Sequence, residues 1–268
     1  MSAQDLWKEG RLDEAVESQI AEVKAHPADP ERRYLLFALV CFLGDLEKAS
    51  RQLDAIGVQD ERLQNGTLIY HNLLASEAER RRVHAGDGAP LIPEGDLPAL
   101  AARVDAIQAL GQGQGAAAAA KVAEAEATEP SADYQVDGKD VTGITDTDEL
   151  LGPTLEIFAG SRYLLLPFDR IRSLDISEPR QLLDLLWAPA ELEDLDGTVA
   201  NVHLPALYAD SHAGKPHLQL GRSTEWAEVD GVVRGRGQKV LALGTDGDPD
   251  SDRPLLSLRR IERVERES

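Results

Sequence analysis

The sequence has one cysteine and few aromatic residues. Cys41 is the only cysteine among 268 residues, so a disulfide within the chain is impossible. It lies in the apolar run from Leu39 to Leu43, which indicates a buried structural thiol. Aromatic residues make up 4% of the chain, so we expect leucine, valine, isoleucine and alanine to fill the core.

Long apolar runs are also missing. No segment approaches the roughly 18 uninterrupted apolar residues that a membrane-spanning helix needs. The first ten residues, MSAQDLWKEG, lack a basic start followed by an apolar stretch, which is the pattern of a secretion signal. We therefore expect a cytoplasmic protein.

Positive charge is scarce. The chain has 28 basic and 48 acidic residues, which gives a formal net charge of −20. This charge repels phosphate backbones and anionic bilayers, so we expect neither nucleic acid nor a membrane as a partner. It favours solubility, and it is compatible with a basic or amphipathic segment of another protein.

A short phrase occurs twice in the first half. GRLDEA begins at Gly10 and GDLEKA begins at Gly44, an offset of 34 residues. A weaker copy begins at Gly113, which is followed 17 residues later by Pro130. A 34-residue period with a glycine turn and a small alanine is typical of the tetratricopeptide repeat. The sequence therefore predicts an all-helical, TPR-like array over residues 1–131.

Arrays of this kind present a concave groove that accepts a peptide or a helix. If the register of the second copy holds, Tyr34, Ala38 and Phe42 face such a groove. The alternative is that these three side chains only pack in the core.

The second half changes to short strand-like runs. Residues 154–176 contain two such runs around Ala159–Ser161, which predicts a hairpin, and residues 178–192 predict a short helix. Further strands are predicted within 198–208, 217–221, 238–244 and 254–264, the last as a solvated edge strand or helix. We therefore predict a compact, mostly antiparallel α+β domain over residues 132–268. Its aromatic residues, which form either core or an apolar docking surface, are Phe158, Tyr163, Phe168 and Trp187.

No group of residues predicts catalysis. His203, His212 and His217 lie near Asp210 and Ser211, a composition that a hydrolase or a metal site can have. The chain lacks the motifs G-x-S-x-G and H-E-x-x-H, and turn chemistry accounts for the loop around Ser211. The acidic stretch 244–252 lacks the spacing of a calcium loop and is interpreted as a solvated loop. We predict no catalytic residue, no metal and no cofactor.

Four segments resemble the ImpE family, also called SciE or TagJ. They are EIFAGSRYLLLPFDRIRSL, PRQLLDLLWAPAEL, VHLPALY and GRSTEW with the following GRGQKVLALG. The resemblance implies an accessory protein of type VI secretion, a non-enzymatic adaptor that binds the N-terminal helix of the small sheath subunit. It also implies an indirect link to the AAA+ unfoldase that recycles contracted sheath. Two alternatives remain: a general repeat adaptor or co-chaperone outside secretion, and a small hydrolase built on the C-terminal domain.

Overall fold

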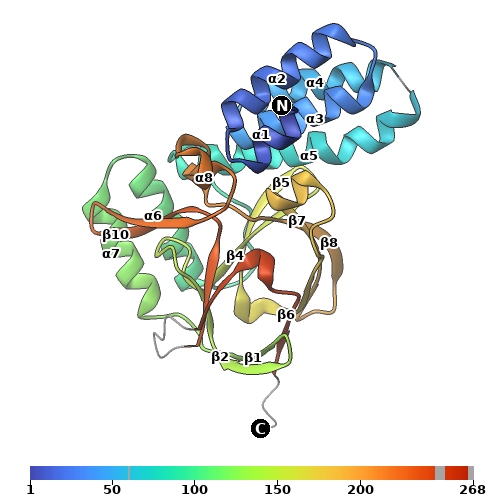
Figure 1. Ribbon diagram of the computed structural model, residues 1–268. Coiled ribbons are helices and arrows are strands. Elements are labelled where there is room, and N and C mark those ends of the chain that lie inside the picture. The colour runs from blue at the N-terminus through green and yellow to red at the C-terminus, as the bar shows by residue number, and fades with distance from the viewer. Residues whose placement is uncertain (60, 245–250, 265–268) are drawn as a thin grey trace.

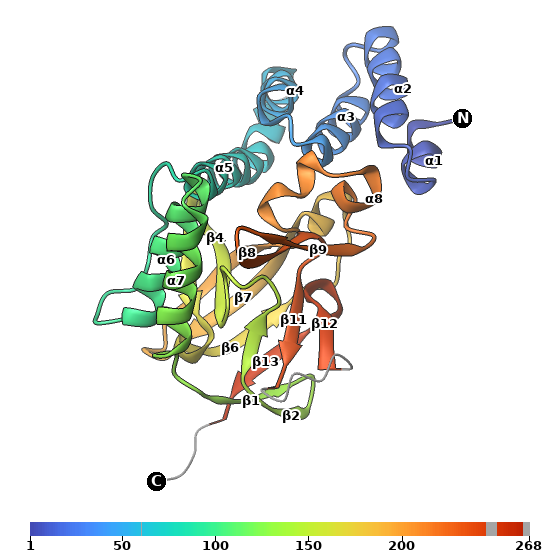
Figure 2. The same cartoon turned by 90° about the vertical axis from the view of Figure 1, so that its left-hand side faces the viewer.

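The first half of the protein is helical. The computed structural model describes residues 1–59, 61–244 and 251–264. Its first helices are α1 (Ala3–Lys8), α2 (Leu12–Ala25), α3 (Pro30–Leu43), α4 (Leu46–Gln59), α5 (Glu61–His84), α6 (Pro98–Gly111) and α7 (Gly115–Glu126). Figures 1 and 2 show α1 to α4 stacked at one end of the molecule, with α5 between them and the sheets. Helices α6 and α7 cover one side of the sheet domain (Figure 2).

The repeat glycines form the turns that the sequence predicts. Gly10, Gly44 and Gly113 all have positive φ angles, of 83°, 76° and 74°. Glycine adopts this conformation without the steric cost that a Cβ atom brings. Helix α3 begins where Asp29 accepts hydrogen bonds from two backbone N–H groups, and it ends at the left-handed Gly44. Paired helices with tight glycine turns confirm the predicted TPR-like array.

The second half forms three antiparallel sheets. The largest has eight strands in the order β2-β1-β13-β6-β7-β8-β4-β5, the second pairs β9 with β10, and the third has the order β12-β11-β3. The strands are β1 (Asp133–Val136), β2 (Lys139–Thr142), β3 (Ile144–Asp146), β4 (Thr154–Ala159), β5 (Arg162–Pro167), β6 (Ile171–Ile176), β7 (Trp187–Asp194), β8 (Val199–Pro205), β9 (Thr224–Val229), β10 (Val232–Gly237), β11 (Val240–Leu243), β12 (Asp252–Pro254) and β13 (Arg260–Arg263). The α+β fold class is confirmed.

The hairpin predicted around residues 159–161 is present, since β4 pairs with β5 from Thr154↔Pro167 to Ala159↔Arg162. The helix predicted within residues 178–192 is wrong. A single 3-10 turn, η2 (Leu182–Leu185), is followed at once by β7, because Trp187 pairs with Pro205 of β8. Tertiary pairing here overrides the helical spacing of the leucines.

Two further local predictions are wrong. Residues 217–221 were expected to form a strand, but the short helix α8 (Pro216–Gln219) begins with a proline that suits a first helical turn. The C-terminal segment was expected at an edge, yet β13 lies between β1 and β6 in the large sheet. Ile261 is buried while Arg260 is exposed, so the charged residues alternate with a core residue inside the sheet. The predicted loop at 244–252 lies mostly outside the described residues.

One hydrophobic cluster crosses from the helices to the sheet domain. It joins Phe37 and Leu39 of α3 with Phe158 of β4 and Tyr163 of β5, all fully buried. A second cluster, which includes Leu174, lies within the sheet domain itself. The division at residue 131 stays a prediction: helix α7 ends at Glu126, β1 begins at Asp133, and the shared cluster packs the two parts together.

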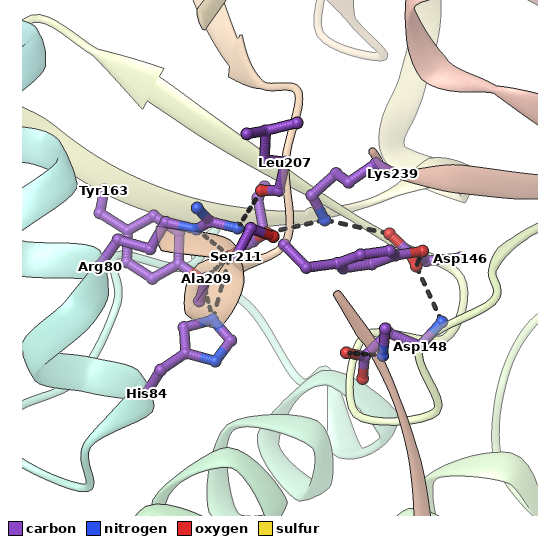
Figure 3. Close-up of polar contacts among 12 residues, drawn as sticks. Arg80, His84, Asp146, Asp148, Tyr163, Leu207, Ala209, Ser211 and Lys239 are labelled. Carbon is purple, nitrogen blue, oxygen red and sulfur yellow. Dashed lines mark hydrogen bonds and ion pairs between the residues drawn. The ribbon is translucent and has the colours of Figure 1, made fainter. Parts of the chain in front are cut away.

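A network of buried charges joins α5 to the sheets, as Figure 3 shows. Arg80 of α5 donates from Nε and Nη2 to the two carboxylate oxygens of Glu156 on β4, at 2.8 and 2.7 Å. Lys239 Nζ lies 2.7 Å from Glu156 Oε2 and 3.0 Å from Asp146 Oδ2. Tyr163 donates its hydroxyl to Glu156 Oε1 at 2.6 Å. The four ionic side chains are at most 3% exposed, so solvent screens these contacts little.

The network keeps Glu156 ionised. Burial by itself raises the pKa of this carboxyl, but Arg80 and Lys239 reverse the effect and hold the pKa well below its usual value of 4.5. Burial and the neighbouring Glu156 raise the pKa of Tyr163, so its hydroxyl stays a neutral donor. Burial also raises the pKa of Asp146, an effect that Lys239 opposes. Glu156 is therefore the anion that both cations share.

Gly44 lies against both α5 and the sheet domain. Its carbonyl oxygen accepts a hydrogen bond from Arg81 Nη1 at 2.7 Å. A Cβ atom at this position would lie 2.6 Å from Cβ of His212, which belongs to the 3-10 turn η3 (Ala209–Ala213). The turn of the repeat thus also permits a close approach to the sheet domain.

We predict that Gly44→Ala destabilises the protein more than Gly138→Ala. Both glycines have φ near +80°, so each substitution costs about 1–2 kcal/mol of backbone strain. Only Gly44 adds a clash with His212, since nothing lies within 4 Å of a Cβ at Gly138. The clash costs about 1–3 kcal/mol more. Chemical denaturation of the two variants measures the difference, and equal losses would contradict the close approach.

We predict that Arg80→Gln lowers the free energy of unfolding by about 3–5 kcal/mol, because it leaves Glu156 buried without its main cation. Arg82→Gln, two positions along the same helix, is the control. Arg82 pairs with Asp87 at 3.0 Å, but its side chain is 63% exposed, so solvent screens the pair and its loss should change stability little. Urea denaturation of the wild-type protein and the two variants measures their free energies of unfolding. Similar losses for both variants would show that the buried network does not stabilise the fold.

The depressed pKa of Glu156 predicts a pH dependence. Its stabilising charge is fully present above the unfolded value of 4.5 and is lost as the pH falls toward the folded value. The stability difference between the wild-type protein and Glu156→Gln should therefore shrink by about 1.4 kcal/mol per pH unit below 4.5. Urea denaturation at pH 7 and between pH 3 and 4.5 measures this. If the stability difference between the two proteins grew as the pH fell, the lowered pKa of Glu156 would be contradicted.

Candidate functional site

A groove of about 560 Å³ lies between α5 and the large sheet, and we call it the α5–sheet groove. Helix α5 contributes Ile69, Tyr70 and Leu73 to one wall. The opposite wall comes from β6, η2, β7 and β8, with Trp187 and His203 among its residues. The groove exists because the contacts of α5 with β4 and β5 hold the helix beside the sheet.

A second groove, of about 430 Å³, lies among α3, α4 and α5, and we call it the repeat groove. Its lining is largely apolar and includes Tyr34, Leu53, Ile56 and Tyr70. Of the three residues predicted to face a groove of the repeat, Tyr34 lines this one, whereas Ala38 and Phe42 do not. Tyr70 lines both grooves, so they adjoin at this residue.

Two tyrosines fix the boundary between the grooves. The hydroxyls of Tyr34 and Tyr70 lie 2.9 Å apart, and both donate to Gln181 Oε1, at 2.9 and 3.1 Å. Tyr70 also packs edge-on against Phe37, with ring centroids 5.4 Å apart. Because α3, α5 and the residue before η2 meet here, the grooves have defined walls.

Negative charge surrounds the α5–sheet groove. Asp175, Asp184 and Glu191 line it, and none of the described residues along it is a lysine or an arginine. His203 adds no positive charge at neutral pH, because burial lowers its pKa below 6.5. Asp175 forms an exposed ion pair with Arg260 at 2.8 Å, while Asp184 accepts backbone hydrogen bonds. The groove therefore favours a ligand with positive charge beside its apolar face.

Apolar side chains remain exposed beside these grooves. Leu68 is 59% and Ile69 is 45% exposed, on consecutive positions of α5. Ile69 lies one turn before the buried Leu73, on the side of α5 that lines the groove, whereas Leu68 lies off that side. Exposed apolar residues at the rim of an apolar groove are typical of protein-binding surfaces.

The structure separates the seven residues predicted to bind a peptide. Tyr34 lines the repeat groove and Trp187 lines the α5–sheet groove. The others are at most 1% exposed and pack in the core: Ala38, Phe42, Phe158, Tyr163 and Phe168. A peptide does not reach these five in this conformation, and the binding role of the whole set stays a prediction.

Sequence reasoning missed the exposed part of α5. The signal was present in the run Thr67–Leu74, where Ile69 and Leu73 are spaced i, i+4, as are Tyr70 and Leu74. Leu68 departs from this spacing. A helix needs only one apolar stripe to pack on one neighbour, so the added Leu68 indicated apolar surface beyond that stripe.

The residues considered for hydrolysis do not form a nucleophile–base pair in the described chain. Ser211 Oγ donates to the carbonyl of Gly237 at 3.2 Å and accepts from its N–H at 2.8 Å. His212 Nδ1 contacts the carbonyl of Ala209 at 3.0 Å, and His203 lies on β8 opposite Phe158. The serine hydroxyl thus joins η3 to β10.

No helix among the described residues is long and apolar enough to cross a membrane.

The sequence and fold match known proteins. Residues 138–262 match the family model described as ImpE protein. Over 229 residues, or 85% of this chain and 82% of the relative, the sequence is 33% identical to the type VI secretion system accessory component TagJ of Pseudomonas aeruginosa. A crystal structure of a Vibrio parahaemolyticus protein has the same fold, with a TM-score of 0.91 over 98% of both chains at 23% identity. The chain therefore belongs to the ImpE/TagJ family of type VI secretion accessory proteins.

Proposed function

We propose that this type VI secretion accessory protein is a non-enzymatic adaptor that binds the N-terminal helix of the small sheath subunit. The observation that carries the proposal is the α5–sheet groove, with exposed Ile69 at its rim and acidic side chains along it. In this mode an amphipathic helix lays its apolar positions i, i+3, i+4 and i+7 into the groove. A basic flank of that helix would face Asp184 and Glu191.

The walls of the groove suit a helix. The half-buried Tyr70 supplies aromatic surface, and tyrosine is a common anchor at interfaces. Trp187, which is 4% exposed, supports the opposite wall from the core. The adjoining repeat groove, with Tyr34, offers a continuation for a longer segment. Preformed walls reduce the ordering cost of binding.

We further propose a cytoplasmic location and an indirect link to the AAA+ unfoldase that recycles contracted sheath. Membership of the secretion family supports this over a general co-chaperone. A basic clamp for acidic tails is a usual requirement of such co-chaperones, and the α5–sheet groove is acidic instead. The position of Ser211, away from a histidine partner, supports an adaptor over a hydrolase.

Ile69→Asp should weaken binding of a synthetic sheath-subunit N-terminal helix at least tenfold, because it places a carboxylate against the apolar face of that helix. Isothermal titration measures the affinity. Ile92→Asp is a matched control, since Ile92 is 44% exposed, compared with 45% for Ile69, and lines neither groove. It should bind like the wild-type protein.

Circular dichroism first establishes that both variants keep the helical content of the wild-type protein. Equal affinities for the two variants would remove the α5–sheet groove as the binding site. Absence of binding to the folded wild-type protein would contradict the partner itself.

A further inference from the structure

We propose that a pocket away from both grooves binds a small zwitterion of amino-acid or dipeptide size. The pocket has a volume of about 410 Å³ and lies between the N-terminal end of α6, the connection from α7 to β1, and the ends of β4 and β5. We call it the α6 pocket. Its residues are not among those of the α5–sheet groove, so this proposal does not depend on the adaptor function.

One side of the α6 pocket is suited to an ammonium group. Tyr134 of β1 is 3% exposed, and its hydroxyl has no hydrogen-bond partner among the described residues. Asp169, also in the lining, is half-buried, and its ion-pair partner in the described chain is Arg170, at the long distance of 4.0 Å. Tyr134 lines the pocket, so a bound ligand would have access to this hydroxyl. An N–H₃⁺ group would supply donors to both oxygens.

Electrostatics support this assignment. Burial raises the pKa of the Asp169 carboxyl, and burial followed by the charge of Asp169 raises the pKa of the Tyr134 hydroxyl. Burial is the main cause of both shifts, and the positive charges of Arg170 and Arg263 offset it only in part. A bound cation would offset the rest.

The other end of the α6 pocket is suited to a carboxylate. Helix α6 begins at Pro98 without a side-chain cap, and its residues Ala99 and Leu100 line the pocket. The first N–H groups of a helix have no partner within the helix and attract anions. Arg103, which also lines the pocket, is already held by Glu129 at 2.7 Å. The N–H groups at the start of α6 are therefore the anion-binding element that we propose.

The wall between the two ends is apolar. Leu97 of the lining lies beside four prolines, Pro98, Pro130, Pro153 and Pro167. Prolines present rigid apolar surface and no N–H donor. The pocket thus offers an anion-binding end, a cation-binding end and an apolar wall, which together match an amino acid or a dipeptide with an apolar side chain.

Isothermal titration with L-leucine and with glycyl-L-leucine tests the proposal and distinguishes the two ligand sizes. We expect saturable binding of at least one of them. Leucinamide and N-acetyl-leucine, which lack one charge each, should bind at least tenfold more weakly than leucine. Saturation by neither zwitterion up to 20 mM (roughly 2 kcal/mol of binding free energy) would overturn the proposal.

Variants of the full-length protein locate the site. Asp169→Asn should reduce affinity about tenfold and Tyr134→Phe about threefold, and both should leave binding of the sheath peptide unchanged. Asp13→Asn is the control for net charge, because Asp13 is exposed on α2 and lies outside the pocket. Its affinity should equal that of the wild-type protein. If Asp13→Asn and Asp169→Asn weaken binding equally, or if neither does, the α6 pocket is not the site.

Discussion

The pairing of Arg80 with Glu156 is the contact on which the arrangement of the two parts depends. It joins the C-terminal part of α5 to a central position of β4, and Lys239 also contacts the same carboxylate. A charge so deeply buried is tolerated only when partners surround it, which restricts the position of α5 on the sheet. The hydrophobic cluster that includes Phe37, Phe158 and Tyr163 buries apolar surface between the two parts. The ionic network restricts the orientation of α5 on the sheet, because its hydrogen bonds are directional.

The position of α5 in turn creates the α5–sheet groove. Leu73 and Leu74 of α5 turn into the core, and Ile69 remains exposed at the rim. A helical repeat alone would offer only the repeat groove. The sheet domain adds a second wall with Trp187 and an acidic border. The protein belongs to the ImpE/TagJ family of type VI secretion accessory proteins. We propose that it binds its partner in that system through the α5–sheet groove.

Local features of the fold could be predicted from the sequence, and contacts between distant residues could not. The turn at Gly44 could be predicted because glycine itself permits a left-handed backbone, whatever its distant neighbours are. The hairpin of β4 and β5 could be predicted because two strand-like runs flank a short turn. The leucines before Trp187 have helical spacing, but the pairing of Trp187 and the following residues with β8 is set by the whole sheet. The site was harder still: Arg80 and Glu156 lie 76 residues apart, and nothing in either segment identifies the other. The repeat register pointed to Tyr34, and Trp187 was one of the aromatic residues considered for either core or a docking surface, whereas Ile69 needed knowledge of which α5 face is buried.

Hydrogen–deuterium exchange with and without the N-terminal helix of the small sheath subunit tests the central claim most directly. The account predicts slower exchange in residues 66–74 of α5 and in β7 and β8, since these segments form the walls of the α5–sheet groove. Exchange in α2 should not change. Protection confined to α2, or to segments that line neither groove, would contradict the account.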